Sequence, residues 1–418
     1  MVKPGYRQTE IGVIPENWEV NSIQSVVTSY RTGGNYKNSP EATESPLIKM
    51  GNLSRGYINL HKIEYVTRGV IPNPADRLQY GDVLFNTRNT PELVGKTAVW
   101  RNELPCAYYN LNLLRFEFDS ERVEPFFFNA ILNTKEAMAE LKNIAKGTTS
   151  VAAIYPQDLM NVKIPIPPIS EQRRIAKAIT DMDCLIEFLE KQIHKKKAIK
   201  QGAMQELLTG KCRLPGFSGR WISQRWKDVL DCFSSGATPY RGNTSFYNGS
   251  IKWVSSGELN YNHIMDTLEH ISPEAMAKAN LTMHPAGTFL MAITGLEAAG
   301  TRGSCALLGT PATTNQSCMA IYGTDKMSTE YLFHYYVQHG DELAFQYCQG
   351  TKQQSYTAAI VRELPIYYPE DIEEQKNIAT LLTTMNEEIK VLEQKLQKYR
   401  QVKQAMMQQL LTGKIRLV

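Results

Sequence analysis

The sequence predicts an α/β (α+β) protein with a two-fold internal repeat, in which two globular domains alternate with two long helices. Three observations support this fold class. The stretch QELLTGKCRL at residues 205–214 returns as QQLLTGKIRL at residues 408–417, identical at eight of ten positions. Each copy closes a long segment whose apolar residues recur at helical spacing. Each of those segments follows about 160 residues of short β-rich runs interrupted by Gly, Pro and Asn.

The two helical segments match each other at an offset of 203 residues without an insertion. Their apolar positions are spaced 4, 3, 4, 3 and 4 residues apart, which is the a/d pattern of a coiled coil. The predicted seam consists of Ile175, Ile179, Met182, Ile186, Leu189 and Ile193 in the first helix, and of Ile378, Leu382, Met385, Ile389, Leu392 and Leu396 in the second.

Start and stop signals set the expected helix lengths. We expect Ser170 to cap the first helix, and Asp371 with Glu374 to form a capping box at the second. Gly210 and Gly413 stand where a terminating glycine belongs. Two helices of roughly 38 residues, each about 57 Å long, are therefore predicted. The matched seams favour packing of the helices against each other over packing of each on its own domain only. Either orientation is open, and an antiparallel pair would have pseudo-two-fold symmetry.

The segments that precede the helices are related more weakly. Residues 47–53 align with 253–259, and residues 80–88 align with 285–295, both at an offset of 206 with Gly81 opposite Gly287. Such domains would share one fold while recognising different ligands. The expected domains are residues 1–166 and 214–369, followed by helices at residues 167–213 and 370–418 respectively.

Composition limits the class of protein. With 42% hydrophobic and 21% charged residues the chain is expected to fold, and no segment approaches the roughly 20 apolar residues of a membrane span. Its start has no apolar core of the kind that a signal peptide needs. The seven cysteines form no C-x-x-C pair, which argues against a zinc site and a disulfide framework. We therefore expect a cytoplasmic protein without a membrane partner. A net charge of +4 permits nucleic-acid binding without requiring it.

Catalytic motifs are not found in the sequence. Gly95-Lys96-Thr97 suggests a P-loop, but position 90 is Thr where a Walker A motif needs Gly. No glycine-rich S-adenosylmethionine motif and no target-amine motif occurs, and His263, His270 and His284 are too loosely spaced for a metal triad. We expect no catalytic residue, no metal and no cofactor.

Polar loops recur at equivalent positions in both halves. They carry Arg, Lys, Asn, Gln, Ser and Thr, the side chains that pair with base edges and phosphates. The candidate DNA-binding residues are Lys49, Asn52, Arg55, Asn86, Thr87, Arg88, Asn89, Lys96, Asn110, Lys146, Thr148 and Thr149 in the first half, and Ser255, Ser256, Glu258, Asn260, Thr294, Arg302, Asn315, Gln316, Lys352, Gln353 and Gln354 in the second. The lysines at 195–197 and 200 could touch phosphates, although a solvated helix face explains them equally well.

The whole arrangement resembles the specificity subunit of type I restriction–modification systems. The resemblance covers essentially the full chain and rests on IPIPPISEQRRIAKAI at the first helix, EEQKNIATLL at the second, and the doubled LLTGK. The family's Pro-x-x-x-Glu-Gln phrase stands at residues 167–172, whereas the second copy, IYYPEDIEEQ, is longer and has a broken proline run. The stretches IGVIPENWEV and RLPGFSGRW also look like the beginnings of the family's recognition domains.

The resemblance implies a function. Each globule would be a target recognition domain that reads one half of an asymmetric, bipartite site in double-stranded DNA. The helices would form an antiparallel coiled coil that sets the unread gap. Two methyltransferase subunits, which carry S-adenosylmethionine and modify adenine, would dock on the chain, and a motor–nuclease subunit would join for cleavage. The chain itself would be non-catalytic.

Two other hypotheses compete with this one. A coiled-coil adaptor without DNA specificity would use its globules to bind proteins. A fragment of a larger fused enzyme is disfavoured because catalytic motifs are not found, and the end at GKIRLV leads us to expect a complete chain. The cations after each terminating glycine would either only cap the helix or also meet a partner subunit; they are Lys211, Arg213, Lys414 and Arg416.

Overall fold

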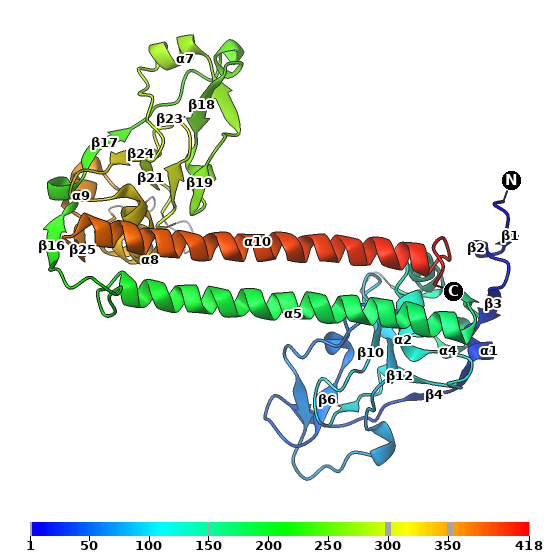
Figure 1. Cartoon of the computed structure of the whole chain (residues 1–418). Helices are drawn as coiled ribbons and strands as arrows, with labels where there is room; N and C mark the ends of the chain where they lie inside the picture. Colours follow the sequence, from blue (N-terminus) through cyan, green and yellow to red (C-terminus); the bar gives the residue numbers. More distant parts are fainter. Residues whose placement is uncertain (1, 149, 297–301, 349–353, 418) are drawn as a thin grey trace. The chain divides into compact units, whose positions relative to one another are not determined.

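The computed structural model describes residues 2–148, 150–296, 302–348 and 354–417. The chain divides into two compact units, of which unit 1 is Met1–Glu190 with Lys395–Val418 and unit 2 is Lys191–Gln394. Each unit contains one globular half and a segment of each long helix (Figure 1).

The globular half of unit 1 is built on two four-stranded sheets. The strand orders are β10-β8-β12-β4 and β11-β6-β7-β5, and smaller sheets pair β1 with β2, β15 with β3, and β14 with both β13 and β9. The strands are β1 Tyr6–Thr9, β2 Gly12–Pro15, β3 Glu19–Ser22, β4 Val27–Thr32, β5 Asn38–Ser39, β6 Pro46–Ile48, β7 Glu64–Val66, β8 Val83–Asn86, β9 Arg88–Asn89, β10 Thr97–Val99, β11 Tyr108–Tyr109, β12 Leu113–Phe118, β13 Lys146–Gly147, β14 Ala152–Ala153 and β15 Lys163–Ile166. The central strand β8 is buried along its whole length, as expected of a strand with both faces covered.

Four short helices accompany these sheets. They are α1 Ile23–Val26, α2 Pro125–Leu132, α3 Lys135–Ile144 and α4 Pro156–Met160, and α1 and α2 pack on the first sheet. The Glu124 carboxylate accepts a hydrogen bond from the Phe127 N–H at 2.6 Å and caps α2, with Pro125 in the first turn. The Thr134 hydroxyl caps α3 in the same way. The main core lies between this sheet, α2 and the two long helices, and a satellite core fills the second sheet.

The globular half of unit 2 repeats this plan. Its sheets have the orders β17-β24-β21-β22-β19, β20-β18-β23 and β16-β25. The strands are β16 Trp221–Arg225, β17 Asp231–Ser235, β18 Ile251–Val254, β19 Asn262–Ile264, β20 Glu269–Ile271, β21 Phe289–Ala292, β22 Cys305–Leu308, β23 Thr313–Thr314, β24 Cys318–Tyr322 and β25 Pro365–Pro369. The helices are α6 Trp226–Val229, α7 Pro273–Lys278, α8 Thr329–Tyr347 and α9 Ala358–Glu363.

The strand orders confirm the weak alignment of the two halves. The order β10-β8-β12-β4 corresponds to β22-β21-β24-β17, and β11-β6-β7 corresponds to β23-β18-β20. The aligned stretches at residues 47–53 and 253–259 each give the end of a strand followed by a 3₁₀ turn. The halves differ at α8, which is one 19-residue helix where unit 1 has α2 and α3.

The long helices are α5 Ile169–Leu207 and α10 Ile372–Leu410, 39 residues each. The predicted cap of α5 is wrong: the carbonyl of Pro168 accepts the N–H groups of Glu171 and Gln172, so the helix begins before Ser170. Asp371 caps α10 as expected, with its carboxylate 2.9 Å from the Glu373 nitrogen. Its predicted capping-box partner, Glu374, instead directs its carboxylate to an arginine, as described below.

The helix ends behave as the sequence predicts. Gly210 and Gly413 adopt φ of +71° and +68°, the left-handed conformation that terminates a helix. Beyond each glycine a hydrogen bond joins residues six positions apart, from the Cys212 N–H to the Glu206 carbonyl and from the Ile415 N–H to the Gln409 carbonyl.

The two helices run antiparallel within each unit (Figure 1). In unit 1, ion pairs join Asp183 to Lys403 at 2.5 Å and Glu190 to Arg400 at 2.6 Å, so rising numbers on α5 meet falling numbers on α10. In unit 2, Lys196 pairs with Glu388 and Lys197 with Glu393, both at 2.6 Å. The twelve predicted seam residues are all buried or half-buried. Packing of the helices against each other is therefore confirmed.

Candidate nucleic-acid interface and its supports

Two predicted loops of unit 1 are joined into one surface by a small sheet. Strand β14 pairs on one side with β9, where Ala153 lies opposite Arg88, and on the other with β13, where Ala153 lies opposite Lys146. The Ile154 N–H also donates to the Thr87 carbonyl at 2.9 Å. Candidates about 60 residues apart in sequence thus lie side by side, because three short strands form a ladder.

A third loop brings two more cations to this part of unit 1. Gly56 forms a bridge with Ala98, and its N–H donates to the Thr97 carbonyl at 2.8 Å, which places Arg55 beside Lys96. Burial lowers the pKa of Arg55, and burial together with repulsion from Arg55 lowers the pKa of Lys96. Among the described residues, neither side chain forms an ion pair. Neighbouring cations without a carboxylate are favourable positions for a phosphate.

The remaining cations of the first half differ in whether they form ion pairs. Arg88 is exposed and has no ion pair among the described residues. Lys146 is exposed but pairs with Asp158 at 2.7 Å, and Lys49 pairs with Glu64 at 3.0 Å. Thr148 is exposed on the β13–β14 turn, whereas Thr149 lies outside the described residues.

The buried asparagines of the first half form hydrogen bonds with the backbone of their own loops. Asn52 is 3% exposed and donates to the carbonyls of Asn59 and His61. Asn86 is fully buried, and its amide oxygen accepts from the Arg88 N–H at 3.2 Å. Asn110, 9% exposed, accepts from the Asn112 N–H. These side chains hold backbone turns, while Thr87 and Asn89 are half-buried beside them.

The second half places its candidates on equivalent loops. Thr294 bridges Ser355, and the Tyr356 N–H donates to the Ile293 carbonyl at 2.8 Å, so the loop after β21 meets the segment before α9. Ser256 is half-buried and Asn260 and Gln316 are exposed. The exposed fraction of the Arg302 side chain is only 15%; it pairs with Asp341 at 3.3 Å and stacks on Phe345.

Other candidates of this half are engaged in local contacts or lie outside the described residues. The Glu258 carboxylate accepts from the N–H and hydroxyl of Ser255 and from the Leu268 N–H. Gln354 is half-buried and has an interaction partner. Lys352 and Gln353 lie outside the described residues.

Two glycines let the asparagine segments approach the neighbouring strand. A Cβ on Gly33 would lie 2.1 Å from the Tyr109 carbonyl oxygen, and one on Gly236 would lie 1.8 Å from the Thr314 carbonyl oxygen. The Gly236 N–H donates to the Asn315 carbonyl, and the Asn315 amide oxygen accepts from the Ser317 N–H at 3.0 Å. The turn that contains Asn110 is therefore placed like the turn that contains Asn315.

The first long-helix junction lies in unit 1 and involves the Glu-Gln pair that begins α5. The guanidinium of Arg416 donates to both oxygens of Glu171 at 2.6 and 2.7 Å, and the Trp18 indole N–H donates to the same carboxylate at 3.0 Å. Arg416 also lies over the Trp18 ring. Burial acts to raise the pKa of Glu171, but the bonds from Arg416 and Trp18 outweigh it and lower the pKa.

The second junction repeats the first inside unit 2. Arg213 donates to both oxygens of Glu374 at 2.5 Å and lies over the Trp221 ring. The adjacent glutamines are also equivalent: Gln172 accepts from the Glu124 N–H and donates to the Pro167 carbonyl, and Gln375 accepts from the Ser328 N–H and donates to the Pro369 carbonyl. Sequence reasoning missed these roles, although the tryptophans stand 203 residues apart, which is the offset of the two long helices.

The profile of one family matches both halves of the chain. The type I restriction modification DNA specificity domain matches residues 15–200 and again residues 219–400. The chain belongs to this family. Each match begins just before the junction tryptophan, Trp18 or Trp221, and ends within a long helix.

Relatives of this family member include archaeal specificity subunits. A putative type I restriction enzyme MjaX specificity subunit of Methanocaldococcus jannaschii is 32% identical over 205 residues, which is 49% of this chain and 48% of the relative. The MjaVIII specificity subunit of the same organism is 29% identical over 215 residues, 50% of this chain and 49% of the relative. The chain thus spans about half the length of the curated relatives it matches.

A solved structure has the same fold as this family member. The crystal structure of a type I restriction–modification S subunit from M. genitalium superposes with a TM-score of 0.59, covering 94% of this chain and 96% of that chain. Sequence identity is 12%, so the likeness concerns the fold alone.

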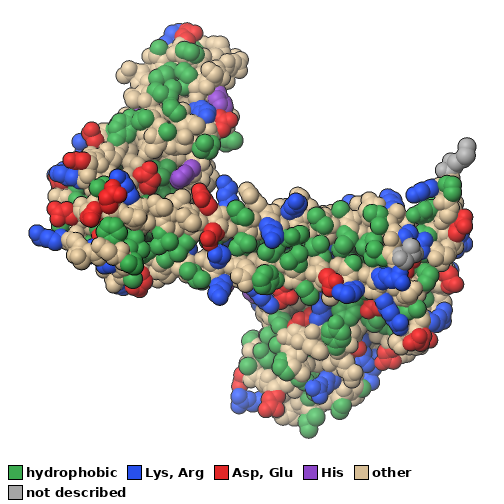
Figure 2. Space-filling view, in the orientation of Figure 1, with side chains coloured by type: hydrophobic (Ala, Val, Ile, Leu, Met, Phe, Trp, Pro, Cys, Tyr) green, Lys and Arg blue, Asp and Glu red, His purple; other side chains and the backbone are tan. Residues whose placement is uncertain are grey.

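In residues 2–148, 150–296, 302–348 and 354–417, no cluster of three His, Cys, Asp or Glu side chains could hold a metal ion. Over the same ranges, no helix is both long and apolar enough to cross a membrane. On the face shown in Figure 2, Lys and Arg side chains are interspersed with Asp and Glu and form no single large basic area.

Proposed function

We propose that the chain is the non-catalytic, sequence-specific DNA-binding subunit of a type I restriction–modification complex. Residues 1–166 and 214–369 would each read one half of an asymmetric, bipartite site in double-stranded DNA. Residues 167–213 and 370–418 would form the spacer helices. The chain would hold no cofactor of its own and act in the cytoplasm.

The observation that carries the proposal is the group of unpaired cations on the joined loops of unit 1. Arg55, Arg88 and Lys96 lie on three neighbouring segments, and none forms an ion pair among the described residues. A cluster that remains unpaired and partly desolvated gains most from a polyanion.

The equivalent loops of unit 2 offer different chemistry. There Arg302 is neutralised by Asp341, and the exposed groups are the amides of Asn260 and Gln316. Amide side chains read base edges by paired donors and acceptors rather than by charge. Similar scaffolds with different loops support recognition of two unlike half-sites.

The long helices support a fixed gap between the half-sites. Each is continuous for 39 residues, or about 58 Å at 1.5 Å per residue, which exceeds one duplex turn of about 34 Å. When two weakly binding domains are joined by a stiff spacer, binding of the first domain raises the effective concentration of the second at its half-site.

Matched apolar side chains on the helices support docking of two methyltransferase subunits. Phe188 and Val391 are 57% and 61% exposed and stand at equivalent positions, as do Ile199 and Val402 at 51% and 41%. Exposed apolar groups repeated at the same offset provide two similar surfaces for two copies of one partner. A motor–nuclease subunit would join the complex for cleavage.

The deciding experiment is methylation mapping with the reconstituted complex. The chain together with the methyltransferase subunit of its system should methylate adenines in one bipartite sequence, whereas the chain alone with S-adenosylmethionine should methylate nothing. Methyl transfer by the lone chain would refute the non-catalytic assignment. Binding to all duplexes with equal affinity at every salt concentration would favour the protein-binding adaptor.

A further inference from the structure

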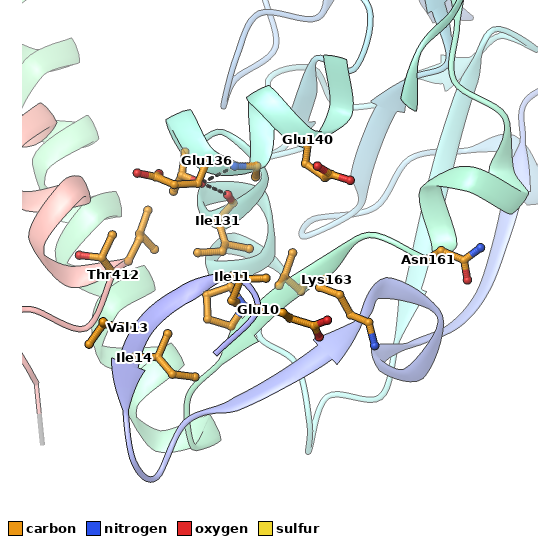
Figure 3. A pocket seen from close by; sticks show the side chains of 15 residues that line it. Glu10, Ile11, Val13, Ile14, Ile131, Glu136, Glu140, Asn161, Lys163 and Thr412 are labelled. Carbon is orange, nitrogen blue, oxygen red and sulfur yellow. Dashed lines mark hydrogen bonds between the residues drawn. The ribbon is translucent and has the colours of Figure 1, made fainter. Parts of the chain in front are cut away.

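Unit 1 has a surface groove that the DNA-binding proposal does not use (Figure 3). Its walls are the β1–β2 hairpin, the junction of α2 and α3, strand β15 and the end of α10, and its volume is about 430 Å³. We call it the hairpin groove. All of its lining residues belong to unit 1.

The floor of the hairpin groove is apolar. Ile14, Ile131, Ile164 and Leu411 line it and are each less than 5% exposed, so they form a firm base continuous with the core. Val13 is 46% exposed, and an apolar group placed on it would remove that surface from water.

The rim of the groove is acidic. Glu10, Glu136 and Glu140 surround it and are exposed, and Lys163 is the single cation of the lining. Among the described residues, none of these four forms an ion pair; Glu140 receives only a hydrogen bond from Asn143 at 3.4 Å. The excess of negative charge repels phosphate, so DNA does not suit this surface.

The described residues of unit 2 lack two of the elements that form this groove. In place of α2 and α3, unit 2 has the unbroken helix α8. Unit 1 breaks at Asn133 and Thr134 because the Thr134 hydroxyl caps a new helix, and this turn makes part of the wall. Unit 2 also has no hairpin before β16, since residues 214–219 lead there directly from the end of α5.

We propose that the hairpin groove binds one segment of a partner protein subunit, in which apolar side chains are flanked by Lys or Arg. The proposal rests on the proposed function, which supplies the partner subunits. The apolar floor selects the apolar side chains, and the three rim carboxylates select the cations. Because, among the described residues, the hairpin and the α2–α3 turn occur in one half and not in the other, the groove takes one such segment per chain, in contrast to the matched helix surfaces. It therefore gives the pseudo-symmetric chain a way to distinguish its two ends.

The test places a photo-crosslinking residue at Val13 in the full chain, assembled with DNA and with the methyltransferase and motor–nuclease subunits of its system. Mass spectrometry should find one crosslinked segment, rich in apolar and basic residues, from a single subunit. Crosslinks to DNA, crosslinks to a second copy of this chain, or no protein crosslink in an assembled complex would each overturn the proposal.

A charge-reversed chain provides a second measurement. Glu10→Lys with Glu136→Lys should weaken association with the crosslinked subunit by about tenfold, because two rim attractions become repulsions. Both glutamates are exposed, so folding should be retained. The matched control, Glu16→Lys with Glu121→Lys, makes the same charge change outside the groove and should associate normally. Equal association of the two variants refutes the groove, whereas loss of specific DNA binding by the unmodified chain would refute the proposed function instead.

Discussion

At the scale of single residues, the two junctions explain why the LLTGK phrase recurs. The phrase ends each long helix and delivers an arginine three residues after the glycine, Arg213 or Arg416. Each arginine pairs with the glutamate that begins the other helix, Glu374 or Glu171. The two arginines are therefore held by carboxylates within the chain.

The Glu171 junction predicts an acid-sensitive stability. Its folded pKa lies below the ordinary value of 4.5, so its contribution is fully present above about pH 4.5 and is lost as the pH falls through the lower, folded pKa. Glu171→Gln should cost about 1–3 kcal/mol at pH 7, because Arg416 loses a charged partner. Urea unfolding at pH 7 and pH 3 measures both effects, and the variant should lose less stability on acidification than the unmodified chain. Glu121→Gln, an exposed change, is the control; an equal loss for both variants would contradict the assignment.

The unpaired cations predict a sequence-independent contribution to DNA affinity. Arg55→Gln and Lys96→Gln should each weaken binding to all duplexes and lower the slope of log K against log salt by about one. Fluorescence anisotropy at several salt concentrations measures the slope. Lys135→Gln removes an exposed cation at the start of α3 and should leave the slope unchanged. A loss restricted to one DNA sequence would show that these side chains contact bases rather than phosphates.

At the scale of elements, the close approach of β4 to the Tyr109 segment depends on a missing side chain. Gly33→Ala and Gly236→Ala would place a Cβ about 2 Å from a carbonyl oxygen, and such overpacking costs about 1–3 kcal/mol. Thermal unfolding should show the loss, and specific DNA binding should fall as the asparagine turns move. Gly51→Ala and Gly257→Ala are matched controls in the two halves, because a Cβ there meets nothing within 4 Å. Wild-type unfolding of Gly33→Ala would contradict the packing.

Aspartate should have different effects at buried and at exposed positions of the long helices. Ile186→Asp with Ile389→Asp buries two charges in the seam and should reduce helix content and prevent assembly. Phe188→Asp with Val391→Asp changes exposed positions and should preserve helix content, measured by circular dichroism, while weakening methyltransferase docking. Normal assembly of the seam variant would refute the role of the seam.

At the scale of the whole molecule, the features that could be predicted from the sequence are the internal repeat and the two long helices. The helix pair follows from the heptads and from Gly210 and Gly413, because these signals are local. The beginning of α5 was missed because a proline carbonyl, which carries no side-chain signal, accepts the first N–H groups. Loop roles were harder to predict: Asn52 and Asn86 have the composition of base readers, yet their amides hold buried turns. Only three-dimensional contacts distinguish an asparagine that supports a loop from one that faces solvent.

The bipartite reading itself predicts a strict dependence on the gap between half-sites. A helix pair is stiff along its axis, so lengthening the DNA gap by one base pair adds about 3.4 Å and rotates one half-site by about a tenth of a turn relative to the other. One globular domain would then face the wrong part of the groove, and affinity should fall toward that of a single half-site. Competition binding with duplexes that differ only in gap length measures this. A mixed-sequence change inside the gap, with its length unchanged, is the control and should have little effect. Equal affinity for gaps that differ by one, two and three base pairs would show that the helix pair does not set the spacing.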